Sequence, residues 1–177
     1  MRNLFHKSGI IVFLILSQIL FSQPTTAPNA PTAGAQDVVS IYSDAYTDVP
    51  AVWNPNWGTN TTVVEDVVIA NNNVKKYTLF NFSGLDFGAA VGGGTIDASF
   101  RTHIRLDYWT EDATSFEVFL ISEGPLETSY TITTTQGGWQ SVDIPLSEYS
   151  SVVDLTKAFQ FKFVGSGTVY IDNLYFN

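Results

Sequence analysis

The stretch His103-Ile-Arg-Leu-Asp-Tyr-Trp109 decides the fold, because apolar and polar side chains alternate along it at every second position. Side chains of a β-strand point alternately to its two faces. The stretch therefore predicts a strand with one core-facing row and one outer row that is polar with an aromatic at its end. The core-facing row is Ile104, Leu106 and Tyr108, and the outer row is His103, Arg105, Asp107 and Trp109.

Short apolar runs of the same kind recur on both sides of this stretch, between turn signals, and no long stretch has the 3.6-residue period of an amphipathic helix. Many short strands joined by Gly, Asn and Pro turns predict an all-β, antiparallel β-sandwich. Gly92 to Gly94 are expected in a connection between sheets, and Gly165 to Gly167 in a tight hairpin. The other expected strands are 38–42, 62–69, 75–82, 116–122, 128–134, 139–144, 158–164 and 168–176.

The N-terminus reads as an export signal. Residues 1–23 combine a basic start with an apolar run that is too short to span a bilayer, and small residues follow it. Residues 24–36 lack large apolar side chains, so we expect a flexible Pro/Thr/Ala-rich leader before a single domain at 37–177. Since the chain has no cysteine, we expect neither a lipid anchor nor disulfides. The mature protein is expected to be extracellular or periplasmic.

Charge narrows the range of partners. Seventeen acidic and eight basic residues give a net charge of −9, and removal of Arg2 and Lys7 with the signal leaves −11. Nucleic acid and anionic membrane surfaces require clustered basic residues, so neither is an expected partner. A neutral or cationic ligand fits better, although the same acidity equally fits simple solubility outside the cell.

Four motifs carry a family resemblance that spans about 38–177. Gly138-Trp-Gln-Ser-Val-Asp-Ile-Pro-Leu-Ser-Glu-Tyr149 and Gly167-Thr-Val-Tyr-Ile-Asp-Asn-Leu-Tyr-Phe176 resemble closing strands of jelly-roll carbohydrate-binding modules. With Ser43-Asp-Ala-Tyr-Thr-Asp48 and Asn54-Pro-Asn-Trp-Gly58, the pattern resembles the modules that accompany family 16 glycoside hydrolases and surface glycan-binding proteins. The resemblance implies a galactose-binding-like jelly roll and a neutral β-glucan ligand similar to laminarin. We expect a monomer, with a separate glycoside hydrolase as the partner if the module serves an enzyme.

Two clusters combine an indole with polar groups, as sugar binding requires, because sugar rings stack their C–H faces on aromatic rings while polar side chains bond the hydroxyls. One cluster lies in a loop and the other on the outer row of the quoted strand. The alternative is that the indoles cap the core, and for Trp139 we expect that structural role. The candidate residues are Trp53, Asn54, Asn56 and Trp57 in the loop, and Trp109, Arg105, Asp107 and His103 on the strand.

The resemblance also implies a structural calcium ion at Asp44 and Asp172, with Asp48 and Asp66 as helpers. Calcium takes several oxygen ligands at once, which two carboxylates from neighbouring strands begin to supply. The alternative is that these acids are solvated or cap turns. One histidine in the mature chain and no cysteine leave zinc and copper with too few of their preferred ligands.

Catalysis is the weaker interpretation. Family 16 enzymes carry a Glu-x-Asp-x-x-Glu strand, which this sequence lacks. A jelly-roll polysaccharide lyase is the alternative, with Arg105 neutralising a uronate and His103 moving the proton. A charge of −11 opposes such polyanionic substrates. A third alternative is a secreted adhesion module that binds another protein.

Overall fold

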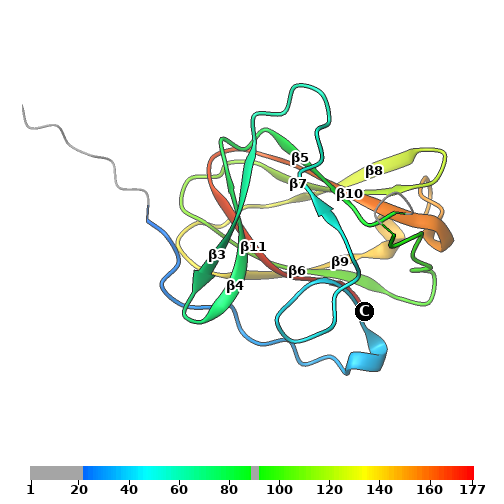
Figure 1. Cartoon of the computed structure of the whole chain (residues 1–177), viewed down its shortest axis with the longest axis horizontal. Helices are drawn as coiled ribbons and strands as arrows, with labels where there is room; N and C mark the ends of the chain where they lie inside the picture. The colour runs from blue at the N-terminus through cyan, green and yellow to red at the C-terminus, as the bar shows by residue number, and fades with distance from the viewer. Residues whose placement is uncertain (1–21, 89–91) are drawn as a thin grey trace, which may run out of the picture.

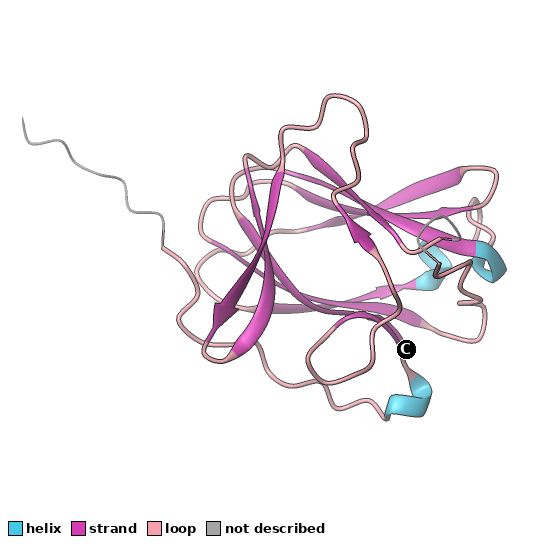
Figure 2. Cartoon of the chain, in the orientation of Figure 1, coloured by secondary structure: helices cyan, strands magenta, loops and turns pink. Residues whose placement is uncertain are grey.

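Two antiparallel sheets pack face to face in the computed structural model, which describes residues 22–88 and 92–177 (Figure 1). Within those residues the helical segments are short 3-10 turns, Ala35–Asp37, Leu146–Glu148 and Leu155–Lys157 (Figure 2). The six-stranded sheet has the order β3-β4-β11-β6-β9, with β1 also paired to β11, and the five-stranded sheet has the order β2-β5-β10-β7-β8. The predicted antiparallel β-sandwich is confirmed. The strands are β1 Val39–Tyr42, β2 Val52–Trp53, β3 Val63–Ile69, β4 Asn72–Thr78, β5 Phe82–Asp86, β6 His103–Thr110, β7 Phe116–Ser122, β8 Leu126–Ile132, β9 Gln140–Pro145, β10 Ala158–Gly165 and β11 Val169–Phe176.

The core-facing row of the quoted strand is confirmed in β6. Ile104, Leu106 and Tyr108 are buried in the main core, while the other row points outward from the six-stranded sheet. Rings from both sheets fill the space between them, including Phe116, Phe161 and Phe176. Aromatic pairs at such spacings add stability beyond the area that they bury.

The expected strand 75–82 is wrong in its bounds, because the structure divides that stretch between two strands of different sheets. Ala70 and Asn71 both have a positive φ, which closes a two-residue turn and starts β4 at Asn72. Leu79 also has a positive φ, and this ends β4 before the chain crosses to β5. None of the expected strands covers β2, which has only two residues.

The two glycine-rich segments have different outcomes. Gly92 to Gly94 fall in the connection from β5 to β6, which belong to different sheets, as predicted. Gly165 to Gly167 join β10 of the five-stranded sheet to β11 of the six-stranded sheet, so the predicted hairpin is wrong. Gly167 has a φ of 67°, which suits the sharp change of direction between the sheets.

The segment after the predicted signal runs along the outer face of the six-stranded sheet (Figure 1). Most of the predicted signal lies outside the described residues. The segment 24–36, expected as a flexible leader, contacts the domain: the Trp139 indole donates to the carbonyl of Thr26 at 2.6 Å, and the Tyr46 hydroxyl donates to the carbonyl of Ala33 at 2.8 Å. Of the helices in the described part of the chain, none is both long and apolar enough to cross a membrane.

Candidate functional site

An indole lies flat on the outer face of the five-stranded sheet. Trp57 belongs to the loop between β2 and β3, and its ring covers Gly84 of β5. A Cβ added at Gly84 would come within 2.6 Å of the ring, so only glycine allows the indole to lie this close to the strand. The ring is half-buried, and it borders a cleft of about 340 Å³.

The remaining walls of this cleft come from β10, β7, the turn after β7 and the start of β8, namely Gln160, Lys162, Ile121, Pro125 and Glu127. Their alignment follows from strand register. One cross-strand row contains Asp86, Gln160, Ile121 and Glu127, and the next contains Gly84, Lys162, Phe119 and Ser129. The same face therefore presents an apolar floor, an indole and several hydrogen-bonding groups. That combination suits a sugar ring, which has both C–H faces and hydroxyls.

The polar groups of the cleft are held by one another. Lys162 pairs with Glu127 at 2.6 Å, and its ammonium lies 3.9 Å from the centre of the Phe119 ring. Gln160 donates to the Asp86 carboxylate at 2.8 Å. These contacts fix the side chains in place before a ligand arrives, which lowers the entropic cost of binding.

The loop that carries Trp57 is organised by Asn54. The Asn54 side chain donates to the carbonyl of Thr62 at 2.9 Å and accepts from Asn60 at 2.8 Å and from Ser83 at 3.1 Å. Because these bonds use both the nitrogen and the oxygen of the side-chain amide, Asn54 positions the loop rather than offering a free group to a sugar. Asn56 is exposed beside Trp57.

Trp53 has a different environment from Trp57. Its ring packs edge-to-face on Tyr42 at 5.3 Å, and the Lys75 ammonium lies 4.8 Å from its centre. It packs against the main core as a partly buried side chain. Pro55 thus separates one indole that faces the interior from one that faces the cleft.

The second predicted cluster lies on the opposite face of the sandwich. His103, Arg105, Asp107 and Trp109 share the outer row of β6, as predicted, but the structure does not bring them together with Trp57. Trp109 is only 5% exposed, because it packs on Tyr170 within a small cluster with Ile69 and Val74. An indole covered in this way has no free ring face for a sugar.

The polar members of that row are held by neighbouring groups. Arg105 contacts the carboxylates of Asp107 at 3.2 Å and Asp143 at 3.0 Å, which leaves the guanidinium neutralised. His103 and Arg105 line a cavity of about 550 Å³ whose other wall is the N-terminal segment 29–33. A lyase would need this arginine for a uronate, yet the arginine already has two carboxylates beside it.

Asp172 lies directly opposite Asp107 on the neighbouring strand, and each is 1% exposed. A register shift after Asp172 turns Asn173 outward, where its amide donates to Asp107 at 2.7 Å. The pKa of Asp172 is raised to about 6, mainly by burial and also by the charges of Asp107 and Asp44, while the hydrogen bonds from Asn72 and the Asn173 backbone lower it.

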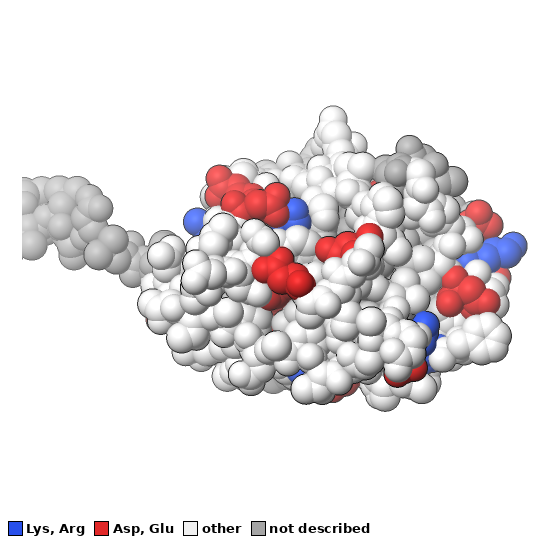
Figure 3. Space-filling view, turned by 60° about the horizontal axis from the view of Figure 1, so that its bottom comes forward, with Lys and Arg blue, Asp and Glu red and all other residues white. Residues whose placement is uncertain are grey.

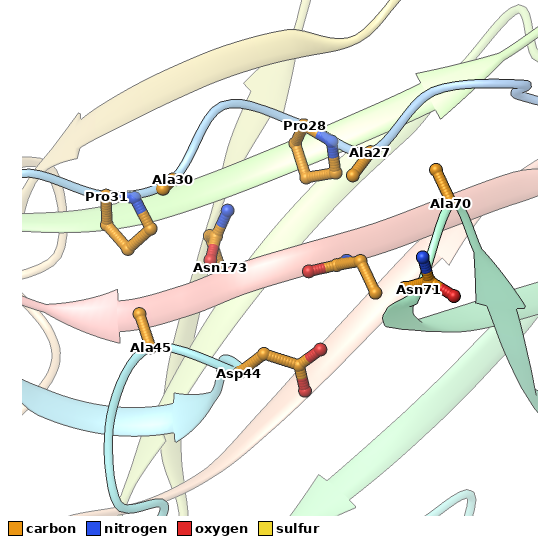
Figure 4. Close-up of a pocket in the computed structure, with 10 residues that line it drawn as sticks. Ala27, Pro28, Ala30, Pro31, Asp44, Ala45, Ala70, Asn71 and Asn173 are labelled. Carbon is orange, nitrogen blue, oxygen red and sulfur yellow. The ribbon is translucent and has the colours of Figure 1, made fainter.

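The acids proposed as calcium ligands accept hydrogen bonds from the protein. Asp44 accepts from the backbone and side chain of Asn73, Asp172 from Asn72, and Asp48 from Ser40. Asp66 pairs with Lys75. In residues 22–88 and 92–177, no three acidic or histidine side chains converge closely enough to hold a metal ion. Each of these carboxylates thus already has a protein donor, and Figure 4 shows Asp44 at the edge of a pocket that Pro28 and Asn173 also line.

The charges of the cleft fit a neutral ligand. Figure 3 shows the other side of the molecule, where basic and acidic side chains of the described residues lie beside one another. In the cleft beside Trp57, the single lysine of the lining is paired with a glutamate. The lining of the cleft therefore offers no unpaired cation to a polyanion.

Sequence reasoning missed the strand residues that line the cleft. The signal was present in Gln160-Phe-Lys-Phe163, where polar residues alternate with buried Phe161 and Phe163 and so mark the outer face of β10. The pairing of Lys162 with Glu127 joins residues 35 positions apart, and no local pattern predicts it.

No protein-family model matches the chain, and no curated protein is significantly similar to it. Solved structures are similar in fold. A family 30 carbohydrate-binding module of a cellulosomal cellulase of Clostridium thermocellum aligns with a TM-score of 0.57 and 16% identity, over 79% of this chain and 96% of that one. A family 11 module of another cellulosomal cellulase of that organism gives 0.55 and 15%, over 78% and 93%.

A further structure is the family 11 module from Clostridium thermocellum in complex with a β-1,3-1,4-mixed-linked tetrasaccharide, with a TM-score of 0.51 and 16% identity, over 71% of this chain and 86% of that one. At such identities the likeness concerns the fold. The chain has the two-sheet jelly-roll fold of carbohydrate-binding modules.

Proposed function

We propose that the chain binds a polysaccharide without catalysis, on the outer face of the five-stranded sheet. The observation that carries the proposal is the Trp57 indole lying on Gly84 beside the cleft of Gln160, Lys162 and Glu127. An indole held flat on a sheet offers a stacking platform for a sugar ring, and the side chains across the cleft supply donors and acceptors for its hydroxyls.

The ligand class that we propose is a neutral β-glucan. Its C–H faces match the indole, and its lack of charge matches a cleft whose lysine is already paired. The mixed-linkage tetrasaccharide bound to the similar family 11 module makes mixed-linkage glucan a first ligand to test, together with laminarin. Binding to a wall polysaccharide would also agree with secretion through the predicted signal peptide.

An affinity-gel and calorimetric screen over laminarin, mixed-linkage glucan, xylan, mannan and alginate tests the proposal. We expect binding to at least one neutral polymer and none to alginate. Absence of binding to every polymer would refute the carbohydrate function, and alginate cleavage with unsaturated products would favour the lyase instead.

Substitution of the indole locates the site. Trp57→Ala should weaken glycan binding about fivefold or more, since stacking of a ring on an aromatic side chain supplies about 1 kcal/mol or more of the binding free energy. Trp57→Phe keeps a ring and should lose less. The matched control is Phe100→Ala, which removes an 85% exposed ring near the end of the six-stranded sheet and should leave affinity unchanged.

Calcium at Asp44, Asp48 and Asp172 stays a prediction of the family resemblance. An ion there would have to displace the amide donors of Asn72 and Asn73 from the carboxylates. Thermal unfolding with added calcium and with chelator decides the matter: a melting temperature that is the same in both conditions removes the ion from the proposal.

A further inference from the structure

Side chains of the segment 24–36 are covered at intervals of one to three residues as far as Ala33. Pro24 is buried, Ala27, Pro28, Pro31 and Ala33 are half-buried, and the residues between them are mostly exposed. The segment has bends at 25–26 and at 33, and between them it forms neither helix nor strand. It therefore lies as an open, proline-containing chain with one edge on the sheet.

Three side chains of the domain donate to carbonyls of this segment. The Trp139 indole donates to Thr26 at 2.6 Å, the Tyr46 hydroxyl to Ala33 at 2.8 Å, and the Asn173 amide more weakly to Asn29 at 3.4 Å. The donors come from places far apart in the sequence, and the fold brings them together in one groove along the outer face of the six-stranded sheet. Carbonyls of a segment without helix or strand are free to accept such bonds, because they have no partner within the segment, as in other open proline-containing chains.

The groove has aromatic and polar walls. Tyr46 packs edge-to-face on Tyr175 with ring centres 5.4 Å apart, and Tyr175 lines the cavity whose other wall includes Pro31. Farther along, Pro28 faces Asp44 across a second cavity of about 410 Å³. Figure 4 shows Asn173 pointing from β11 toward the N-terminal segment that carries Pro28 and Pro31.

We propose that the outer face of the six-stranded sheet is a groove for an extended proline-rich peptide, and that residues 24–36 of the same chain occupy it. Aromatic grooves whose side chains donate to carbonyls are a common means of recognising proline-rich segments. The groove and the glycan cleft lie on the outer faces of different sheets, so a ligand in one does not cover the other. A proline-rich segment of another chain would have to displace the resident one.

This assignment explains an otherwise unusual distribution of side chains. Trp139 is a partly buried indole on an outer sheet face, and its N–H has a carbonyl of the segment as its partner. Asn173 has a strained backbone with a φ of 49°. Its side-chain amide donates both to the carbonyl of Asn29 in the segment and to the carboxylate of Asp107 in the sheet.

A nicked protein tests the proposal. A site for a specific protease is inserted between Gly34 and Ala35 of the full chain, and the chain is cut after folding. A fluorescent synthetic peptide of residues 24–34 is then titrated into the nicked protein and followed by anisotropy. We expect saturable binding, and a peptide with Pro24, Pro28 and Pro31 replaced by alanine should bind more weakly.

Trp139→Phe is the matched variant, because it keeps a ring and removes the indole donor. We expect about fivefold weaker peptide binding, the typical effect of one hydrogen bond, with glycan affinity unchanged. Absence of peptide binding to a nicked protein that keeps its near-ultraviolet circular dichroism overturns the groove.

A second measurement uses the uncut chain and does not require the nicked form to stay folded. Proteinase K should cut within 24–36 more slowly in the native chain than in the free peptide, and Trp139→Phe should accelerate that cut. Equal rates in the chain and the free peptide overturn the proposal. Either result leaves the glycan screen unaffected, so this proposal and the proposed function fail separately.

Discussion

The Trp57 ring rests on Gly84, and three of its carbons lie within 2.7 Å of the position that a Cβ on residue 84 would occupy. No L side chain fits in that space without moving the indole. The glycine is in the middle of β5, where glycine usually weakens a strand. Its presence there is explained by the close approach of the ring, which fixes one wall of the cleft.

Gly84→Ala is therefore expected to displace the indole and weaken glycan binding about tenfold, while the melting temperature changes by only a few degrees. The ring sits in a loop and can move, so the strand itself need not shift. Calorimetry with the best glycan of the screen and a thermal melt measure the two effects. The control is Gly138→Ala, whose Cβ would have no neighbour closer than 3.8 Å. Unchanged affinity in Gly84→Ala would show that the indole is not the platform.

Trp53→Ala is expected to lower the free energy of unfolding by about 2 to 4 kcal/mol, in the range for truncation of large packed side chains. The substitution removes the ring between Tyr42 and Lys75 and leaves the cleft residues in place. Urea unfolding measures the loss, and calorimetry on the folded protein should find nearly normal glycan affinity. A large loss of affinity with normal stability would place Trp53, rather than Trp57, in contact with the ligand.

Strand alternation carried most of the fold prediction. The row Ile104, Leu106 and Tyr108 is buried because a period of two leaves one face to the core, and this is visible in seven residues. The alternation of side chains does not show which of the two sheets a strand belongs to. Leu79 adopts a positive φ that its residue type does not favour, so nothing local marks the crossing between β4 and β5.

The candidate site was predicted only in part, for a related reason. Trp57 and Asn56 stand out in a polar loop, but the surface below them consists of side chains from four separate strands. Trp109 had the same pattern of an aromatic among polar residues, and tertiary packing on Tyr170 buried it. Whether an outer sheet face meets solvent or another segment of the chain depends on tertiary contacts, and strand periodicity does not report them.

Charge in the cleft gives a specificity prediction. Glu127→Gln removes the carboxylate that holds Lys162 at 2.6 Å and leaves the ammonium unpaired over Phe119. We expect weak alginate binding to appear at low salt and to disappear as salt screens the charge, with little change for neutral glucan. Affinity electrophoresis at two salt concentrations measures both. Glu111→Gln makes the same charge change at the end of β6, and an equal gain there would mean that net charge, not Lys162, is responsible.

Asp172 gives a prediction of stability against pH. Burial raises its pKa to about 6 from 3.8, so between these values the folded state binds a proton that the unfolded state has released. The free energy of unfolding must therefore fall as pH rises from about 4 to about 6, and then level off. At about 1.4 kcal/mol for each pKa unit, the fall is at most about 3 kcal/mol. Burial also raises the pKa of Asp48, which adds to the fall. Urea unfolding from pH 4 to 7 measures the slope, and Asp172→Asn should flatten it whatever its effect on stability at a single pH. An equally steep slope in that variant would assign the effect to other groups.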